Sequence, residues 1–114
     1  MKIKEAQQEV KDFTLRQSWL DVPNIDKIDH IHEELTEISR LLRYKTEDER
    51  KSVVIEHKEK LQKEIGDVLF CTLRLSNQLG VDAQKGFLET LQKVQIKFAS
   101  QSESQSSDNE REAI

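Results

Sequence analysis

The chain has 114 residues, enough for one domain and too few for two, and its net charge of −4 argues against coating nucleic acid, which needs a basic surface. Charged residues make up 35% of the chain and aromatic residues only 5%, so any core must be mostly aliphatic. With three glycines and one proline, the composition disfavours a β-sandwich or a glycine-rich nucleotide fold.

The cysteine count and the hydropathy pattern limit the kinds of site and the cellular compartment that the sequence allows. Cys71 is the only cysteine, which excludes an intrachain disulfide and a zinc site built from cysteines. No stretch approaches the roughly 18 apolar residues of a membrane span. The first ten residues, MKIKEAQQEV, lack the apolar run of a signal peptide. These features predict a cytoplasmic protein that does not enter a membrane.

The first half of the chain predicts two helices. From residue 3 to about residue 17, apolar residues recur at mostly three-to-four spacing, which indicates a helix. Pro23 disfavours a helical conformation at the residue before it, so residues 18–24 are predicted to form a connecting loop. A second helix is expected to begin with Asn24 or Asp26 as N-cap and to end near Tyr44.

The second half predicts two more helices and a tail. Thr46, followed three residues later by Glu49, has the spacing of a capping box, and helical periodicity then continues to about Leu79. The first two turns of this long helix carry few apolar residues, so they could be frayed or belong to a loop. Gly80 is a natural C-cap, and Asp82 is expected to cap a helix over residues 83–98.

Short connections between four helices predict an all-α fold, a four-helix bundle over residues 1–98. Residues 99–114 are rich in serine, glutamine and acids, which predicts a polar, flexible or weakly helical tail. Because the bundle is small, we expect a second copy of the chain to complete it.

Two helices each carry a pair of carboxylates beside their apolar stripe. In HIHEELTEI (residues 30–38), Glu34 and Glu37 are three residues apart. In KEIGDVLF (residues 63–70), Glu64 and Asp67 have the same spacing, which places each pair on one helix face. If the helices pack antiparallel, the four carboxylates converge and repel unless a cation neutralises them. Each pair alone is also common on a solvated helix, and this interpretation stays open at the level of pattern.

Oxygen ligands in this number suit Mg²⁺, with Mn²⁺ as a possible substitute, because both accept carboxylates, waters and phosphate oxygens. Neither helix has the Glu-x-x-His pair of a di-iron bundle, and the sequence contains no HExxH, GxSxG or glycine-rich phosphate loop. His30 and His32 are expected at the surface or behind the ligands.

The phrases EELTE (33–37), KEIGDVLF (63–70), LGVD (79–82) and IKF (96–98) resemble the MazG-like nucleoside triphosphate pyrophosphohydrolases of the all-α NTP pyrophosphatase superfamily. The resemblance covers about residues 16–98. The segment RQSWLDVP also resembles the region before the first acids in the short deoxynucleotide pyrophosphatase branch. The resemblance implies Mg²⁺-dependent cleavage of a (d)NTP between the α and β phosphates, giving a (d)NMP and pyrophosphate. A role in removing unwanted nucleotides from the pool would follow from that reaction.

The resemblance also implies roles for individual residues. It implies Mg²⁺ coordination by Glu34, Glu37, Glu64 and Asp67. It implies that Glu33 helps to orient a ligand or a water. From the chemistry, either Glu37 or Glu33 is the candidate to accept the proton of the attacking water. The positions implied for substrate binding are Trp19 and Tyr44 for the base and Lys97 for the phosphates, and Arg74 is a further candidate for phosphate binding.

Several departures and alternatives accompany these roles. Arg74 stands where many members have Asn, and the basic residues that often follow the KF phrase are absent. Arg74 could instead pair with Glu64 or Asp67, Tyr44 could pack at a helix end, and Lys97 could be solvated.

Two other functions remain open at the level of sequence, a phosphoribosyl-ATP pyrophosphatase and a non-catalytic helical interaction module. The expected partners are a nucleoside triphosphate and further copies of the chain, as a homodimer or a dimer of dimers, without nucleic acid or membrane.

Overall fold

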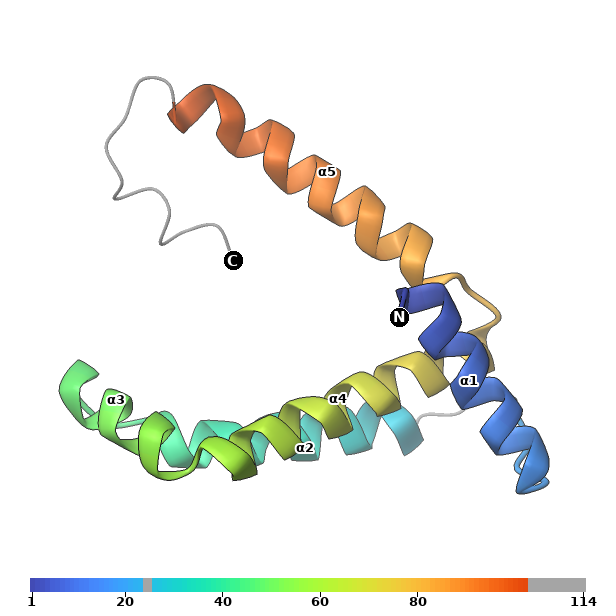
Figure 1. Ribbon diagram of the computed structural model, residues 1–114, viewed down its shortest axis with the longest axis horizontal. Coiled ribbons are helices and arrows are strands. Elements are labelled where there is room, and N and C mark those ends of the chain that lie inside the picture. The colour runs from blue at the N-terminus through green and yellow to red at the C-terminus, as the bar shows by residue number, and fades with distance from the viewer. Residues whose placement is uncertain (24–25, 103–114) are drawn as a thin grey trace. The chain divides into compact units, whose positions relative to one another are not determined.

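The computed structural model describes residues 1–23 and 26–102, and within them every regular element is a helix (Figure 1). The elements are α1 (Ile3–Arg16), α2 (Asp26–Leu42), α3 (Glu47–Glu56), α4 (Lys58–Leu79) and α5 (Ala83–Ser102). The predicted all-α class is therefore confirmed, although the described residues form five helices where periodicity suggested four. The chain divides into two compact units, Met1–Val81 with the first four helices and a second that begins at Asp82.

Helix α4 is the centre of the first unit. It packs along α2 and against α1, while α3 contacts both α2 and α4. Helices α2 and α4 lie side by side and run in opposite directions (Figure 1). This is the antiparallel arrangement that convergence of the two acid pairs requires.

Local sequence signals set several helix ends. Thr46 Oγ1 accepts from the Glu49 backbone N–H at 3.2 Å, and the Glu49 carboxylate accepts from the Thr46 N–H at 2.8 Å, so the predicted capping box is confirmed. Gly80 ends α4 in the left-handed region at φ 66°, and the Asp82 side chain accepts from the Lys85 N–H at 3.0 Å, both as predicted.

Helix α1 ends in the same way as α4, but with serine in place of glycine. Ser18 has φ 59°, its N–H donates to Leu15 O at 3.0 Å, and the Trp19 N–H donates to Thr14 O at 2.9 Å. This pair of bonds is a Schellman motif, which satisfies two carbonyls that the helix end leaves free. It holds the backbone of Trp19 against the last turn of α1.

Two predicted boundaries were wrong. The long helix from Thr46 to Leu79 is two helices, because His57, at φ −113° and ψ 28°, leaves the α region between α3 and α4. Helix α2 ends at Leu42, near Tyr44 as predicted, and begins at Asp26, so its N-cap falls outside the described residues. Helix α5 continues to Ser102, so residues 99–102, predicted as tail, are helical, and the remainder of that tail lies outside the described part.

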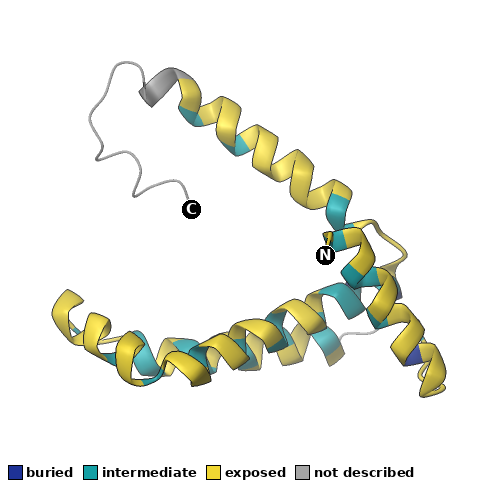
Figure 2. Ribbon diagram, viewed as in Figure 1, coloured by how far each residue is buried: buried dark blue, intermediate teal, exposed yellow. Residues whose placement is uncertain are grey.

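No apolar side chain is fully buried among the described residues (Figure 2). The buried residues there are polar: Thr14, Ser76 and Gln78. The predicted apolar stripes are only partly covered, since Val68 on α4 is half-buried while Ile65 and Leu69 are 49% and 58% exposed. A single copy of the first unit therefore lacks the aliphatic core that its composition requires.

Candidate metal centre

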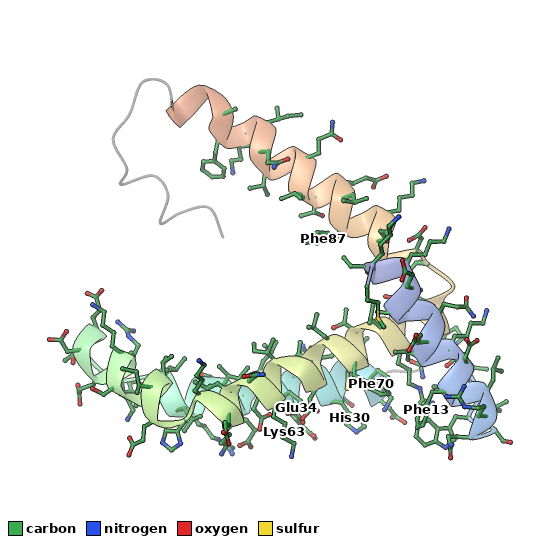
Figure 3. All side chains as sticks on the ribbon, viewed as in Figure 1. Phe13, His30, Glu34, Lys63, Phe70 and Phe87 are labelled. Atoms are coloured by element: carbon green, nitrogen blue, oxygen red, sulfur yellow. The ribbon has the colours of Figure 1, made fainter. Side chains whose placement is uncertain are left out.

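Three of the four predicted metal ligands come together between α2 and α4. One carboxylate oxygen from each of Glu34, Glu64 and Asp67 lies within 4.8 Å of the other two, and all three residues are half-buried. Figure 3 shows Glu34 where α2 passes alongside α4. We call these three residues the acid triad. The triad forms because the i, i+3 spacing on α4 and the antiparallel pairing with α2 bring both helix faces to one line.

The other acids of HIHEELTEI lie outside the triad. Glu37 is half-buried, and its Oε1 accepts from Arg40 Nη1 at 3.3 Å, yet its charge still acts on Glu34. Glu33 is exposed, as are both histidines, and His30 Nδ1 lies 3.0 Å from Lys27 Nζ. The histidines are thus placed at the surface as expected, and Glu37 is the nearer of the two candidate bases.

The triad is electrostatically unfavourable when every group is ionised. The pKa of Glu34 is raised from 4.5 to about 7, first by a hydrogen bond with Glu64, then by burial and by the charges of Glu64, Asp67 and Glu37. A proton on Glu34 thus relieves the repulsion at the helix interface. Glu64 Oε2 is buried and has no hydrogen-bond partner among the described residues. Such an orphaned buried oxygen is costly unless a cation or a donor reaches it.

The donor set fits a hard divalent cation. Three carboxylates offer only oxygen atoms, which Mg²⁺ and Mn²⁺ prefer, and they leave further coordination positions for water or phosphate oxygens. Cys71 lies one turn after Asp67, but burial raises the pKa of its thiol above the ordinary value, which keeps it protonated and unsuited to bind a metal. The triad consists of three of the four residues predicted as metal ligands, and the charge of the fourth, Glu37, acts on Glu34.

Two of the predicted substrate-binding residues contact each other. The Arg74 guanidinium lies over the ring of Trp19, 4.7 Å from its centroid, and Arg74 Nε is 3.9 Å from Asp21 Oδ1. Arg74 therefore pairs with Asp21, and not with Glu64 or Asp67, the partners that helix spacing suggested. Sequence reasoning missed Asp21 and Thr14, whose Oγ1 is 3.3 Å from Asp21 Oδ2. No local spacing signals a partner 53 positions away.

Of the other two predicted substrate residues, Tyr44 lies in the first unit and Lys97 in the second. Tyr44 is 96% exposed, has φ 60°, and its ring lies 5.7 Å from the Arg43 guanidinium. Lys97 belongs to the second unit, where its ammonium lies 5.3 Å from the ring of Phe98. The geometry of the first unit thus brings together Trp19 and Arg74 but not Tyr44.

These features define an all-helical protein in which an antiparallel helix pair presents an oxygen-only acid triad suited to a hard divalent cation. A model of the MazG nucleotide pyrophosphohydrolase domain matches residues 25–97, well over half of the chain, and the chain belongs to this family. The matched segment contains the whole triad. No curated protein and no solved structure was found to match the chain significantly. None of the described helices has the length and apolar character needed to cross a lipid bilayer.

Proposed function

We propose that the chain hydrolyses a nucleoside or deoxynucleoside triphosphate between the α and β phosphates in a Mg²⁺-dependent reaction, with the nucleoside monophosphate and pyrophosphate as products. The observation that carries the proposal is the acid triad with its orphaned Glu64 oxygen, inside the residues that match the pyrophosphohydrolase family. Removal of unwanted nucleotides from the pool is the role that such a reaction would serve.

Glu34, Glu64 and Asp67 would hold Mg²⁺, with Glu37 as a further ligand or through a water. When bound, Mg²⁺ neutralises charge on the phosphates and lowers the pKa of a coordinated water. Glu37 is better placed than Glu33 to accept the proton of the attacking water, because it lies on the triad side of α2 while Glu33 is exposed. The half-buried helix interface limits bulk water and so strengthens each of these interactions.

We further propose that a second copy of the chain covers the apolar residues that one copy exposes. Exposed apolar residues on α2 and α4 include Ile28, Leu35, Ile65, Leu69 and Phe70. A surface of this kind is a typical subunit interface in a small helical protein. Light scattering should show a dimer or a dimer of dimers, and Leu69→Lys should lower the mass. Ile55→Lys on α3, whose side chain is 80% exposed, is the matched control and should not. A wild-type monomer with full activity would contradict the assembly.

The function is tested by incubating the protein with each NTP and dNTP and Mg²⁺ and scoring pyrophosphate against phosphate. We expect pyrophosphate release that chelation abolishes, and we expect Glu34→Gln and Asp67→Asn to abolish it while helix content stays unchanged. Cleavage of phosphoribosyl-ATP with little activity on free dNTPs would instead identify the protein as a phosphoribosyl-ATP pyrophosphatase. Copurification with another protein and no pyrophosphate release would instead indicate an interaction module.

A further inference from the structure

A second buried polar cluster, distinct from the triad, joins α1, the loop after it and α4. The side chains of Arg74 and Asp21 are only 12% and 16% exposed. Thr14, which is fully buried, places its Oγ1 2.9 Å from Lys11 O and 3.3 Å from Asp21 Oδ2. We call Trp19, Asp21 and Arg74 the arginine clamp.

The clamp holds the Arg74 guanidinium against an aromatic ring and a carboxylate. Its Cζ lies over the Trp19 ring, 4.7 Å from the centroid, while Asp21 Oδ1 balances its charge at 3.9 Å from Nε. Arg74 Nε and Asp21 Oδ1 are both buried and have no hydrogen-bond partner among the described residues, so the pair acts by charge and packing. A guanidinium that is covered in this way is poorly available to a phosphate in solvent. Arginine suits the position because its planar group stacks on aromatic rings, which a lysine ammonium cannot do equally well.

The clamp lies on the same face of α4 as the triad. Arg74 follows Asp67 by seven residues, which is about two turns and about 10 Å along the axis. Cys71, between them, is influenced by the charges of both residues, which agrees with this shared face. Trp19, held over Arg74, therefore lies beyond the triad toward the C-terminal end of α4.

Tyr44, the other candidate for binding a base, lies toward the opposite end of the helix pair. It follows Glu34 by ten residues, about 15 Å along α2 if the helical rise is continued. Because α2 and α4 are antiparallel, that direction leads away from Arg74 (Figure 1). A base whose phosphates meet the triad of one chain can reach only one of the two aromatic residues of that chain.

Trp19 is the better prepared of the two. Its backbone N–H donates to Thr14 O at 2.9 Å, its ring meets Phe13 edge-on at 5.5 Å between centroids, and the Arg74 guanidinium on α4 lies over the ring. The residue is still 43% exposed, so part of the indole remains open to a ligand. A ring that is fixed before binding loses less entropy when a base stacks on it.

We propose that Arg74 is a positioning residue that holds Trp19 as the stacking platform for the base of the nucleotide bound at the same chain's triad, with Asp21 keeping Arg74 in place. The inference rests on the proposed function for its substrate. It assigns Arg74 to the base end of the nucleotide through Trp19, and not to the phosphates.

Trp19 is the only tryptophan, so intrinsic fluorescence reports on the clamp without any assay of turnover. We expect Arg74→Ala to increase quenching of the emission by acrylamide about twofold or more, Arg74→Lys to increase it less, and Asp21→Asn to increase it as well. Arg43→Ala is the matched control, because Arg43 also lies over an aromatic ring, that of Tyr44, and it should leave the quenching unchanged. If Arg74→Lys and Asp21→Asn each fold and each leave the quenching unchanged, the clamp is refuted.

Kinetics separate positioning from phosphate contact. Arg74→Ala and Trp19→Ala should each raise KM for a nucleoside triphosphate about three- to tenfold with a smaller change in kcat, the size expected when one stacking or cation–π contact is lost. Both variants should leave the inhibition constant of inorganic triphosphate, a competitor that has no base, unchanged. A rise in that inhibition constant equal to the rise in KM for the nucleotide after Arg74→Ala would make Arg74 a phosphate ligand and overturn the proposal.

A binding measurement distinguishes failure of this inference from failure of the proposed function. Added nucleoside triphosphate with Mg²⁺ should quench Trp19 emission in the wild type, after correction for absorbance, and less so in Arg74→Ala. Quenching without pyrophosphate release would retain the platform and refute the hydrolase. Pyrophosphate release without nucleotide-dependent quenching would retain the hydrolase and refute the platform.

Discussion

Replacing Glu34 by Gln should make the metal-free protein more stable and the enzyme inactive. The amide keeps the size of the side chain and can donate a hydrogen bond to Glu64, but it carries no charge. An acid that serves only to stabilise the fold would lose a favourable contact when neutralised. Glu34 instead loses repulsion, because its pKa is raised by the hydrogen bond with Glu64, by burial and by three neighbouring carboxylates.

The size of the gain follows from the spacing of the triad. Two charges whose oxygens lie 4.8 Å apart, the limit observed within the triad, repel by about 1 kcal/mol in water and by about 3.5 kcal/mol at an effective dielectric constant of about 20. For half-buried groups with solvent screening, we expect Glu34→Gln to raise the free energy of unfolding at pH 8 by about 1–2 kcal/mol. In a chain of this size that corresponds to a rise in Tm of roughly 4–10 °C.

Thermal unfolding at pH 8, with and without Mg²⁺, measures both parts of the prediction. Wild-type protein should gain about 2.7 kcal/mol of stability when Mg²⁺ exceeds its Kd about 100-fold, and Glu34→Gln should lose most of that gain and all pyrophosphate release. Glu59→Gln, an exposed acid on α4 that is not part of the triad, is the matched control and should change neither property. If Glu34→Gln destabilised the metal-free protein, or kept a wild-type response to Mg²⁺, the electrostatic account of the triad would be refuted.

Three further outcomes test the local physics. In the metal-free protein, the free energy of unfolding should fall as pH rises from about 5 to about 7, because folded Glu34 holds a proton that the unfolded chain, with a pKa near 4.5, has released. Thermal melts across this range should show Tm falling with pH, and saturating Mg²⁺ should remove that dependence. Thr46→Ala should lower the stability of α3 by about 1 kcal/mol, because it removes the capping box. Hydrogen exchange should become faster only in α3 and the first turn of α4. Unfolding of the whole chain at the same pH would contradict this. Ser18→Gly should stabilise the protein by up to about 1 kcal/mol, because a non-glycine residue is strained at φ 59°. Gly80→Ala should destabilise it by about 1 kcal/mol from backbone strain alone, because Gly80 has φ 66° and the added Cβ has no neighbour within 4 Å. Chemical denaturation of both variants should show these opposite signs.

Local spacing predicted the parts of this protein that local physics determines. The capping box at Thr46, the left-handed turn at Gly80 and the cap at Asp82 depend on neighbours within a few residues, and all three are confirmed. The acid pairs were visible for the same reason, since residues three apart share a helix face. Their convergence required one further assumption, the antiparallel packing of two long amphipathic helices, which the structure confirms.

Other features depend on contacts that no local pattern contains. The break at His57 was missed because periodicity continues across it, and the Leu61 N–H still donates to His57 O at 2.9 Å. As an alternative to phosphate binding, helix spacing offered Glu64 or Asp67, about three and two turns earlier, as the partner of Arg74. In the structure its partner is Asp21, from a loop 53 positions earlier in the chain. Helix spacing identifies possible partners on the same helix, but it contains no information about a loop that packs against that helix.

The low burial of apolar residues and the raised pKa of Glu34 lead to one view of how the α2–α4 pair is built. Along the line where the two helices meet, half-buried aliphatic residues alternate with the triad, so part of the interface is repulsive in the free chain. The same helices carry exposed apolar residues that one copy does not cover. Two kinds of ligand would then stabilise the same two helices. A cation would bind the triad, and a second copy of the chain would cover the exposed apolar residues. The residues that make the chain incomplete by itself are thus the residues through which its proposed ligands would stabilise it.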